Sequence, residues 1–223
     1  MSNDSAVVVK PLPAPLSGSA HVPGDKSISH RAVLFSAMAE GTSNVSGVLD
    51  SEDVRSSIGA VTALGAQVDL NVGEDGSLSG SITGWGAAGP SQPAGPIDCG
   101  NSGTTARLLM GVLAPWDITV ELTGDDSLRR RPMRRITAPL MKMGVHFEPA
   151  GKETLPIVET GTRVLRAVDY EAPMASAQLK TAVLLAGVFA QGVTTLTEPA
   201  PSRSHTELML PEYGVPTTAG TRV

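Results

Sequence analysis

The chain has 223 residues, a formal net charge of −5 and a single cysteine, Cys99. An acidic composition disfavours general nucleic-acid binding, and one cysteine excludes an intramolecular disulfide, which fits a reducing cytoplasm. No apolar run approaches the ~18 residues that cross a membrane, and the four histidines lack metal-ligand spacing. We therefore expect a cytoplasmic protein without a membrane, nucleic-acid or metal partner, in which Cys99 is a small buried residue.

The first polar motif is residues 23–31, Pro-Gly-Asp-Lys-Ser-Ile-Ser-His-Arg, which lead into an apolar, Ala-rich segment. Backbone N–H groups and the helix dipole favour an anion at such a helix start. Lys26 and Arg31 add full charges, and Ser27 or Ser29 can donate a hydroxyl. The motif predicts an anion site, with an ordinary helix start as the alternative.

A pattern of apolar helix followed by strand occurs three times along the chain. The helical segments are residues 32–39, 106–114 and 182–190, and their first alanines are 74 and 76 positions apart. Each is apolar on most faces, which predicts burial on several sides. The strand-like runs that follow them are residues 43–48, 118–122 and 193–196.

A second helical pattern, also repeated three times, follows these strands. Three further helices are expected to begin near Glu52, Pro132 and Thr206 and to close at Gly65, Gly144 and Gly214, where glycine suits a left-handed C-cap. Two helical patterns that both recur at similar spacing predict an internal triplication, with generic α/β composition as the alternative. Pseudo-symmetry would make the first helices parallel and bring their polar starts, residues 26–31, 101–105 and 176–180, into one anion site.

The second helix start, residues 99–107, has two glycines and a group of small polar residues. Glycine lets a backbone approach a ligand closely, and Asn, Ser or Thr can cap a helix. The spacing excludes a P-loop, because no Gly-Lys-Ser/Thr follows. An ordinary capped helix remains the alternative here.

Five arginines fall between residues 129 and 135. We expect Pro132 to open a helix, one of the arginines to face a ligand and the others to face water. Two further helix starts, at residues 175–180 and 202–207, are also polar. No catalytic triad or pair of carboxylates stands out, so the sequence indicates binding without acid–base machinery.

Together, residues 24–31, residues 100–104, Arg131-Pro132 and Ser176-Ala177-Gln178 resemble the 5-enolpyruvylshikimate-3-phosphate (EPSP) synthase family over roughly residues 10 to 223. The resemblance implies an α/β (α+β) enolpyruvyl transferase fold, a pseudo-threefold domain of βαβαββ units with buried parallel helices. Residues 1–20 would belong to the other, C-terminal domain. Residues 21–223 would form the first globular domain, with its third repeat cut short.

The resemblance also implies a reaction and a set of binding residues. The family transfers the enolpyruvyl group of phosphoenolpyruvate to the 5-hydroxyl of shikimate 3-phosphate and releases phosphate, as a monomer without a cofactor. By resemblance, the residues that hold shikimate 3-phosphate are Lys26, Ser27, Arg31, Ser176, Ala177, Gln178 and Arg203. Those at phosphoenolpyruvate, where glyphosate competes, are Lys26, Gly103 and Arg131, and Asn101 joins the substrate-binding set. Arg203 departs from its family branch, since Ser204 follows where Asp is usual.

The family is roughly twice as long as this chain, and its catalytic acids and bases lie in the other domain. We therefore expect residues 1–223 alone to be inactive or nearly so. One alternative is a non-catalytic anion-binding fragment or pseudoenzyme. Another is the sister enolpyruvyl transferase acting on UDP-N-acetylglucosamine. That enzyme typically has Lys-Asn where this chain has Lys26-Ser27, and Cys99 is badly placed for its loop cysteine.

Overall fold

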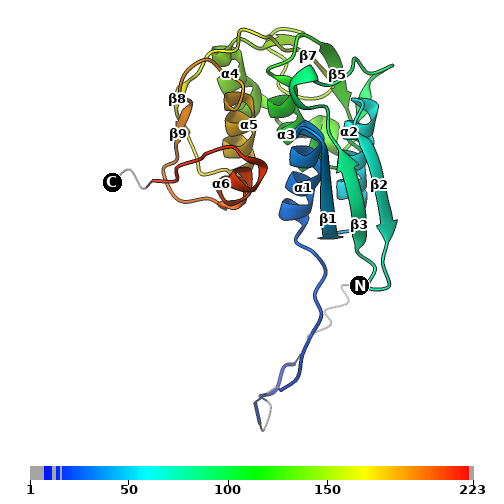
Figure 1. The fold of residues 1–223 in the computed structure, drawn as a ribbon. Helices are drawn as coiled ribbons and strands as arrows, with labels where there is room; N and C mark the ends of the chain where they lie inside the picture. The colour runs from blue at the N-terminus through cyan, green and yellow to red at the C-terminus, as the bar shows by residue number, and fades with distance from the viewer. Residues whose placement is uncertain (1–7, 12–13, 16, 221–223) are drawn as a thin grey trace, which may run out of the picture.

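The computed structural model describes residues 8–11, 14–15 and 17–220, which form three successive units (Figure 1). The first unit contains α1 (Lys26–Met38), β1 (Thr42–Val48), α2 (Glu52–Ala63), β2 (Gln67–Val72), β3 (Leu78–Thr83) and the short helix η1 (Gly86–Ala88). The second contains β4 (Ile97–Asp98), α3 (Gly103–Leu113), β5 (Thr119–Thr123), η2 (Leu128–Arg130), α4 (Arg134–Met143), β6 (His146–Glu148) and β7 (Ile157–Thr160). The third contains β8 (Asp169–Glu171), α5 (Ala177–Gly187), β9 (Thr195–Thr197), α6 (His205–Met209) and η3 (Leu210–Tyr213).

The three sheets share parts of one strand order. They run β1-β3-β2, β4-β5-β7-β6 and β8-β9, so β5-β7-β6 repeats β1-β3-β2 and β8-β9 repeats β4-β5. In the first two units the closing strand lies antiparallel beside the strand that follows the central helix, with Thr42 opposite Thr83 and Thr119 opposite Thr160. The pairs β4–β5 and β8–β9 are both parallel. This shared topology confirms the predicted repetition and the α/β class.

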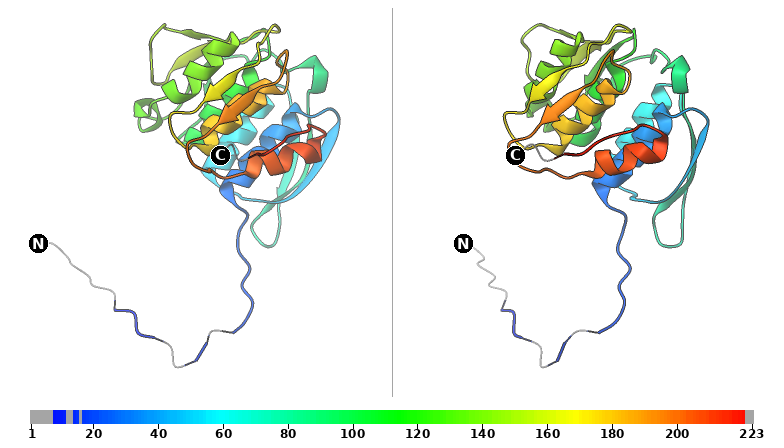
Figure 2. Two further views of the ribbon diagram at one scale, coloured as in Figure 1. Left: turned by 90° about the vertical axis from the view of Figure 1, so that its left-hand side faces the viewer. Right: turned by 60° about the vertical axis from the view of Figure 1, so that its left-hand side comes forward.

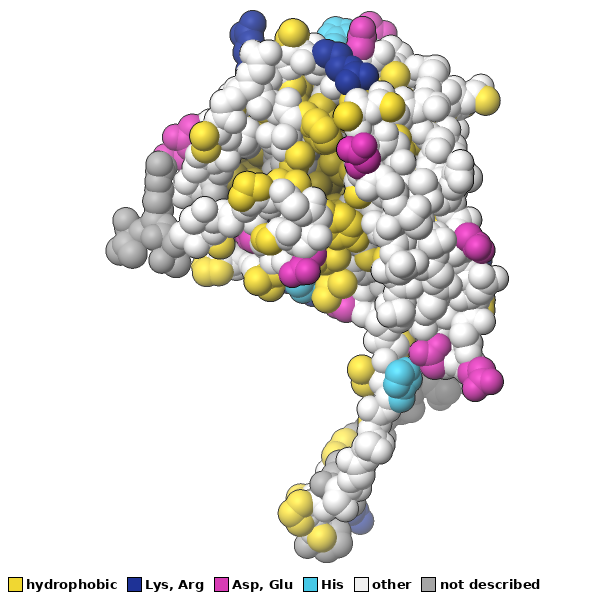
Figure 3. Space-filling view, in the orientation of Figure 1, with side chains coloured by type: hydrophobic (Ala, Val, Ile, Leu, Met, Phe, Trp, Pro, Cys, Tyr) yellow, Lys and Arg dark blue, Asp and Glu magenta, His cyan; other side chains and the backbone are white. Residues whose placement is uncertain are grey.

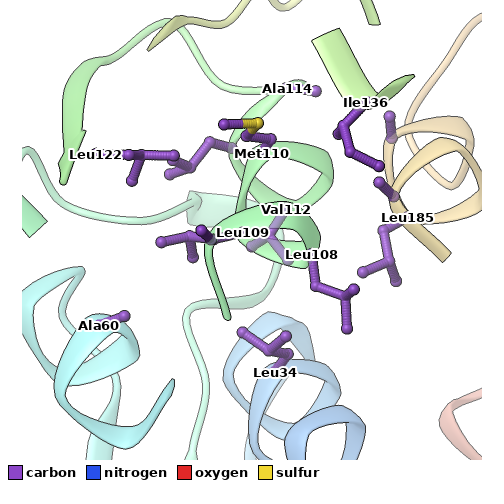
Figure 4. Close-up of a cluster of buried hydrophobic side chains, with 14 of the residues drawn as sticks. Leu34, Ala60, Leu108, Leu109, Met110, Val112, Ala114, Leu122, Ile136 and Leu185 are labelled. Carbon is purple, nitrogen blue, oxygen red and sulfur yellow. The ribbon is translucent and has the colours of Figure 1, made fainter. Parts of the chain in front are cut away.

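The three central helices form the core, with α3 in the middle (Figure 4). Leu34 of α1, Leu108 of α3 and Leu185 of α5 are fully buried, as is Cys99. The helices α3 and α5 approach so closely that a Cβ on Gly111 would lie 2.3 Å from the Ala182 carbonyl oxygen. The prediction that these helices are buried on several sides is confirmed, and so is the burial of Cys99.

The second helix of each unit ends as the sequence predicts. Gly65, Gly144 and Gly214 have φ angles of +99°, +112° and +75°. In each case the next residue donates its N–H to a carbonyl five positions back, as Val145 does to Leu140 at 3.1 Å. This left-handed C-cap explains why glycine recurs at these positions.

Three predicted boundaries differ in the structure. Helix α4 begins at Arg134, two residues after Pro132, because residues 128–130 form a separate turn and the Met133 N–H bonds to the Glu153 carbonyl at 2.6 Å. Helix α5 ends at Gly187, although its apolar run continues to Ala190. The strand β9 begins at Thr195, two residues later than expected, because Thr194 packs against Gly187 where the chain turns back.

The described residues before α1 form no helix or strand, and residues 17–23 are exposed and extend away from the helices and sheets (Figure 2). The assignment of residues 1–20 to another domain stays a prediction, and residues 1–7, 12–13 and 16 lie outside the described part. Within that part, none of the helices combines the length and the apolar character needed to cross a membrane.

Candidate anion-binding site

At the N-terminus of each central helix, the side chain of the N-cap residue accepts a backbone hydrogen bond. Asp25 accepts a hydrogen bond from the Ile28 N–H at 2.9 Å, Ser102 from the Thr105 N–H at 3.1 Å, and Ser176 from the Leu179 N–H at 3.4 Å. Capping fixes where each helix begins. It leaves the remaining first-turn N–H groups and the positive dipole ends at one side of the domain.

Contacts between side chains bring the three helix starts together. Gln178 donates to Thr104 at 3.0 Å, which joins the second residues of α5 and α3. Arg203 donates to the Ser27 hydroxyl at 3.1 Å, which brings the segment before α6 to the start of α1. Arg31 of α1 donates to Thr181 of α5. The prediction that three separate polar starts form one cluster therefore agrees with the geometry.

Lys26, the first residue of α1, belongs to this cluster and forms an ion pair. Its Nζ donates to Asp53 Oδ2 at 2.7 Å, and 52% of its side chain is exposed. An exposed pair of this kind contributes little to stability. The ammonium is therefore placed to exchange its carboxylate partner for a ligand anion.

A group of arginines surrounds Gln178 and Gly103. Arg107 donates to the Gln178 side-chain oxygen at 3.2 Å, and Arg135 donates to the same oxygen at 2.9 Å. Arg131 donates to Asn101. A Cβ on Gly103 would lie 2.7 Å from Arg107 Nη1 and 3.3 Å from Arg131 Nη1, so glycine leaves these groups room.

Among the described residues, none of Arg107, Arg131 and Arg135 forms a direct ion pair, and Asp125 is linked to Arg131 through Asn101. Burial, followed by the positive charges of Arg135 and Arg131, lowers the pKa of the Arg107 guanidinium to about 10, which still leaves it charged at neutral pH. The Nε atoms of Arg107 and Arg135 are buried and have no hydrogen-bond partner. Positive charge without a direct ion pair, together with spare donors, is an arrangement that an anionic ligand would satisfy.

Arg31 and Lys180 are more buried than Lys26, and their hydrogen bonds hold neighbouring elements of the site together. Arg31 is 2% exposed and donates to the Thr206 hydroxyl at 2.8 Å. Burial lowers its pKa to about 10. Lys180 bonds to Glu198 at 2.9 Å and to Glu207 at 2.7 Å. The buried ion network fixes the start of α5, where Glu198 also accepts the Ser176 N–H.

A series of hydrogen bonds through hydroxyl groups connects α1, α2 and α3. The Nδ1 atom of His30 lies 2.8 Å from the Ser57 hydroxyl, which lies 2.8 Å from Thr105. Thr105 in turn bonds to Ser102 at 2.7 Å. Burial lowers the pKa of His30 to about 4, so the imidazole is neutral at pH 7. Its role here is to connect α1 to α2 by a hydrogen bond.

The expectation that all but one of the arginines in residues 129–135 face water is wrong, whereas which of them faces a ligand stays a prediction. Two of them, Arg131 and Arg135, point into the cluster, while Arg129, Arg130 and Arg134 are exposed. Because α4 begins at Arg134, Arg135 is the second residue of the helix, and its guanidinium reaches Gln178 of α5. Arg107 was not singled out from the sequence, because an arginine in an apolar helix carries no local signal.

The remaining predicted site residues line the same side. Ala177 begins α5, Asn101 donates to Asp125 at 2.6 Å, and Ser27 is half-buried beside Arg203. No group of three or more His, Cys, Asp or Glu in the described ranges is placed to hold a metal. The ligand roles of the individual residues stay predictions.

The pseudo-threefold architecture and its cluster of cationic helix starts define the enolpyruvyl transferase class. Residues 11–222 match the family model for EPSP synthase (3-phosphoshikimate 1-carboxyvinyltransferase), so the chain belongs to the EPSP synthase family. It is 44% identical over 215 residues to the 3-phosphoshikimate 1-carboxyvinyltransferase of Xanthomonas campestris pv. campestris (strain B100), covering 96% of this chain and 48% of that protein. For the protein of that name from Paramagnetospirillum magneticum, the identity is 48% over 212 residues, covering 93% and 47%.

A solved structure of EPSP synthase from Acinetobacter baumannii superimposes with a TM-score of 0.84 at 42% identity. The match covers 91% of this chain and 45% of that one. This chain therefore spans about half the length of the curated relatives it matches. The fold predicted from the sequence is confirmed by this structural match.

Proposed function

We propose that this chain provides the shikimate 3-phosphate side and part of the phosphoenolpyruvate side of an enolpyruvyl transferase active site. The reaction would transfer the enolpyruvyl group of phosphoenolpyruvate to the 5-hydroxyl of shikimate 3-phosphate and release phosphate. Glyphosate would compete at the phosphoenolpyruvate position near Gly103. The observation that carries the proposal is the arginine cluster without a direct ion pair at Gln178 and Gly103.

The geometry supports two neighbouring binding positions, one for each of two anionic ligands. Ser27, Arg203 and Ser176 lie where α1, α5 and the segment before α6 meet, which suits a ligand with a phosphate and several hydroxyls. Arg131 and Gly103 lie at the start of α3, which suits a small anion such as phosphoenolpyruvate. Gln178 bonds to groups on α3 and α4 and would lie between the two ligands.

Shikimate 3-phosphate is expected to bind the isolated chain, and Lys26→Ala is expected to weaken that binding by about tenfold or more, since a hydrogen bond to a charged group is lost. Isothermal titration calorimetry would measure both dissociation constants. Lys142→Ala is the matched control, because Lys142 is exposed near the end of α4 and lies over the Tyr170 ring. Equal affinity in the chain and in Lys26→Ala would contradict the proposed role of Lys26, and absence of binding in a folded chain would contradict the proposed site.

Turnover is expected to be absent or barely detectable with the isolated chain, since a tetrahedral intermediate needs placed acids and bases, and the family resemblance puts these in the other domain. Phosphate release would be measured with both substrates present. The C-terminal half of the A. baumannii enzyme, purified separately, would then be added to test complementation. Substantial turnover by residues 1–223 alone would overturn the division of the active site between two halves.

A further inference from the structure

The Gln178 side chain is held by three hydrogen bonds that together fix the direction of its amide. Its oxygen accepts from Arg135 Nη2 at 2.9 Å and from Arg107 Nη1 at 3.2 Å. Its nitrogen donates to the Thr104 hydroxyl at 3.0 Å. A flipped amide would turn its N–H groups toward the two guanidinium groups, which carry donors only, and both charge-assisted bonds would be lost. The two arginines therefore decide where the oxygen and the nitrogen of this amide lie.

This orientation leaves a hydrogen-bond donor at the site. A glutamine amide carries two N–H groups, and among the described residues Thr104 accepts one of them. Gln178 is half-buried in the first turn of α5, so its side chain still reaches the surface of the site. The group that Gln178 offers to a ligand is therefore an N–H. The ligand atom that such a group selects is an acceptor oxygen of a phosphate, carboxylate or hydroxyl.

Arg107 and Arg135 differ in what else they hold. Arg107 is 6% exposed and also donates to the backbone carbonyls of Gly103 and Pro132, so it supports the start of α3 and the segment before α4. Arg135 is half-buried, and within the described ranges its guanidinium bonds to Gln178 alone, since its Nε is buried without a partner. Removal of the Arg135 side chain would therefore release Gln178 and leave the backbone contacts of the site in place.

The neighbouring arginine of the same helix has no part in this contact. Arg134 and Arg135 are the first two residues of α4, and successive residues of an α-helix point about 100° apart. Arg134 is exposed and pairs with Glu153 at 2.7 Å, whereas Arg135 bonds to Gln178 of α5. The two side chains therefore carry the same charge at adjacent positions, and one of them contacts the glutamine.

We propose that Arg135 is a positioning residue, whose hydrogen bond fixes the Gln178 amide so that an N–H faces an oxygen of the anionic ligand. This inference deepens the proposed function and rests on it for the ligand, for which shikimate 3-phosphate is the probe. Hydrophobic side chains gather in the middle of the face drawn in Figure 3, and its Lys and Arg side chains are few and lie mainly at the upper edge. That face therefore has no cationic cluster that would compete for the probe.

Nuclear magnetic resonance of the side-chain amides in the isotope-labelled chain tests the orientation without a ligand, and Gln178→Ala identifies the Gln178 signals. We expect the Gln178 amide to be protected from exchange with water in the wild type and to lose that protection in Arg135→Met. Arg134→Met is the matched control, because it removes the same charge one residue away, and it should leave the protection unchanged. Circular dichroism melts would show that the variants fold. Equal protection in Arg135→Met and the wild type would overturn the proposal.

Calorimetric titration with shikimate 3-phosphate tests the consequence for binding. Arg135→Met should raise the dissociation constant about tenfold, and Arg134→Met should change it by less than about twofold. In the Gln178→Ala background, Arg135→Met should have an effect below about twofold, because the amide that it positions is gone. The same loss in both backgrounds would overturn the proposal, since Arg135 would then act on the ligand directly or through its charge. Absence of binding, with Gln178 protection still dependent on Arg135, would contradict the proposed function and support the role of Arg135 in holding the amide.

Discussion

Replacing Gly111 by Ala is expected to destabilise the chain by about 2–3 kcal/mol, although alanine is the better helix former. The new Cβ would lie 2.3 Å from the Ala182 oxygen and 2.6 Å from its Cα, and both atoms belong to backbone that cannot rotate away. The helices α3 and α5 would have to separate. Because Thr104 and Gln178 join the starts of these two helices, shikimate 3-phosphate should also bind more weakly.

The matched control for this change is Gly59→Ala on α2. A Cβ on Gly59 would meet nothing within 4 Å, so the substitution should stabilise the chain by about 0.5–1 kcal/mol through helix propensity alone. Urea unfolding of both variants, followed by circular dichroism, would measure the difference. If Gly111→Ala were as stable as Gly59→Ala, the close contact between α3 and α5 would not exist in solution.

Replacing Glu159 by Gln is expected to stabilise the chain at neutral pH by about 2 kcal/mol. Glu159 is 1% exposed on the inner face of β7, and neither carboxylate oxygen has a hydrogen-bond partner. Burial raises the pKa of this carboxyl well above its ordinary value of 4.5. The folded state therefore holds the proton more tightly than the unfolded chain does.

The sign of the pH dependence follows from that order of pKa values. The contribution of Glu159 to stability is fully present below the unfolded pKa and is lost as pH rises toward and through the folded pKa, at up to about 1.4 kcal/mol per pH unit. Glutamine does not titrate, so the advantage of Glu159→Gln should be small at pH 4.5 and grow toward pH 7.

Urea unfolding at several pH values would test this, with Glu121→Gln on the neighbouring strand β5 as the control. Glu121 is exposed, so its substitution makes the same chemical change without altering a buried group. A constant difference between wild type and Glu159→Gln from pH 4.5 to 7 would show that Glu159 titrates normally in the folded chain.

The triplicated pattern was readable because it depends on local physics. Uninterrupted apolar segments require burial, and glycines at Gly65, Gly144 and Gly214 require a left-handed conformation, so both leave periodic traces in the sequence. The helix starts were equally visible, since Ser102 and Ser176 are residues that cap helices. The family resemblance rested on the helix starts at residues 24–31, 100–104 and 176–178, together with Arg131-Pro132.

The composition of the arginine cluster was not readable in this way. Whether Arg135 faces water or Gln178 depends on where α4 begins and how it packs beside α5, and the expected start at Pro132 was two residues early. Arg107 lies within an apolar helix, where its sequence neighbours indicate only burial. Long-range packing selects these two side chains, and no local pattern encodes it.

The sequence alone therefore determined the class of fold, the three helix starts and the family, because propensity, capping and spacing act over a few residues. The tertiary structure decided which charged groups share one site and that Lys26 is held by Asp53. These features join residues up to 176 positions apart, as in the bond between Ser27 and Arg203. Only the packing of parallel helices against one another brings such residues within hydrogen-bond distance.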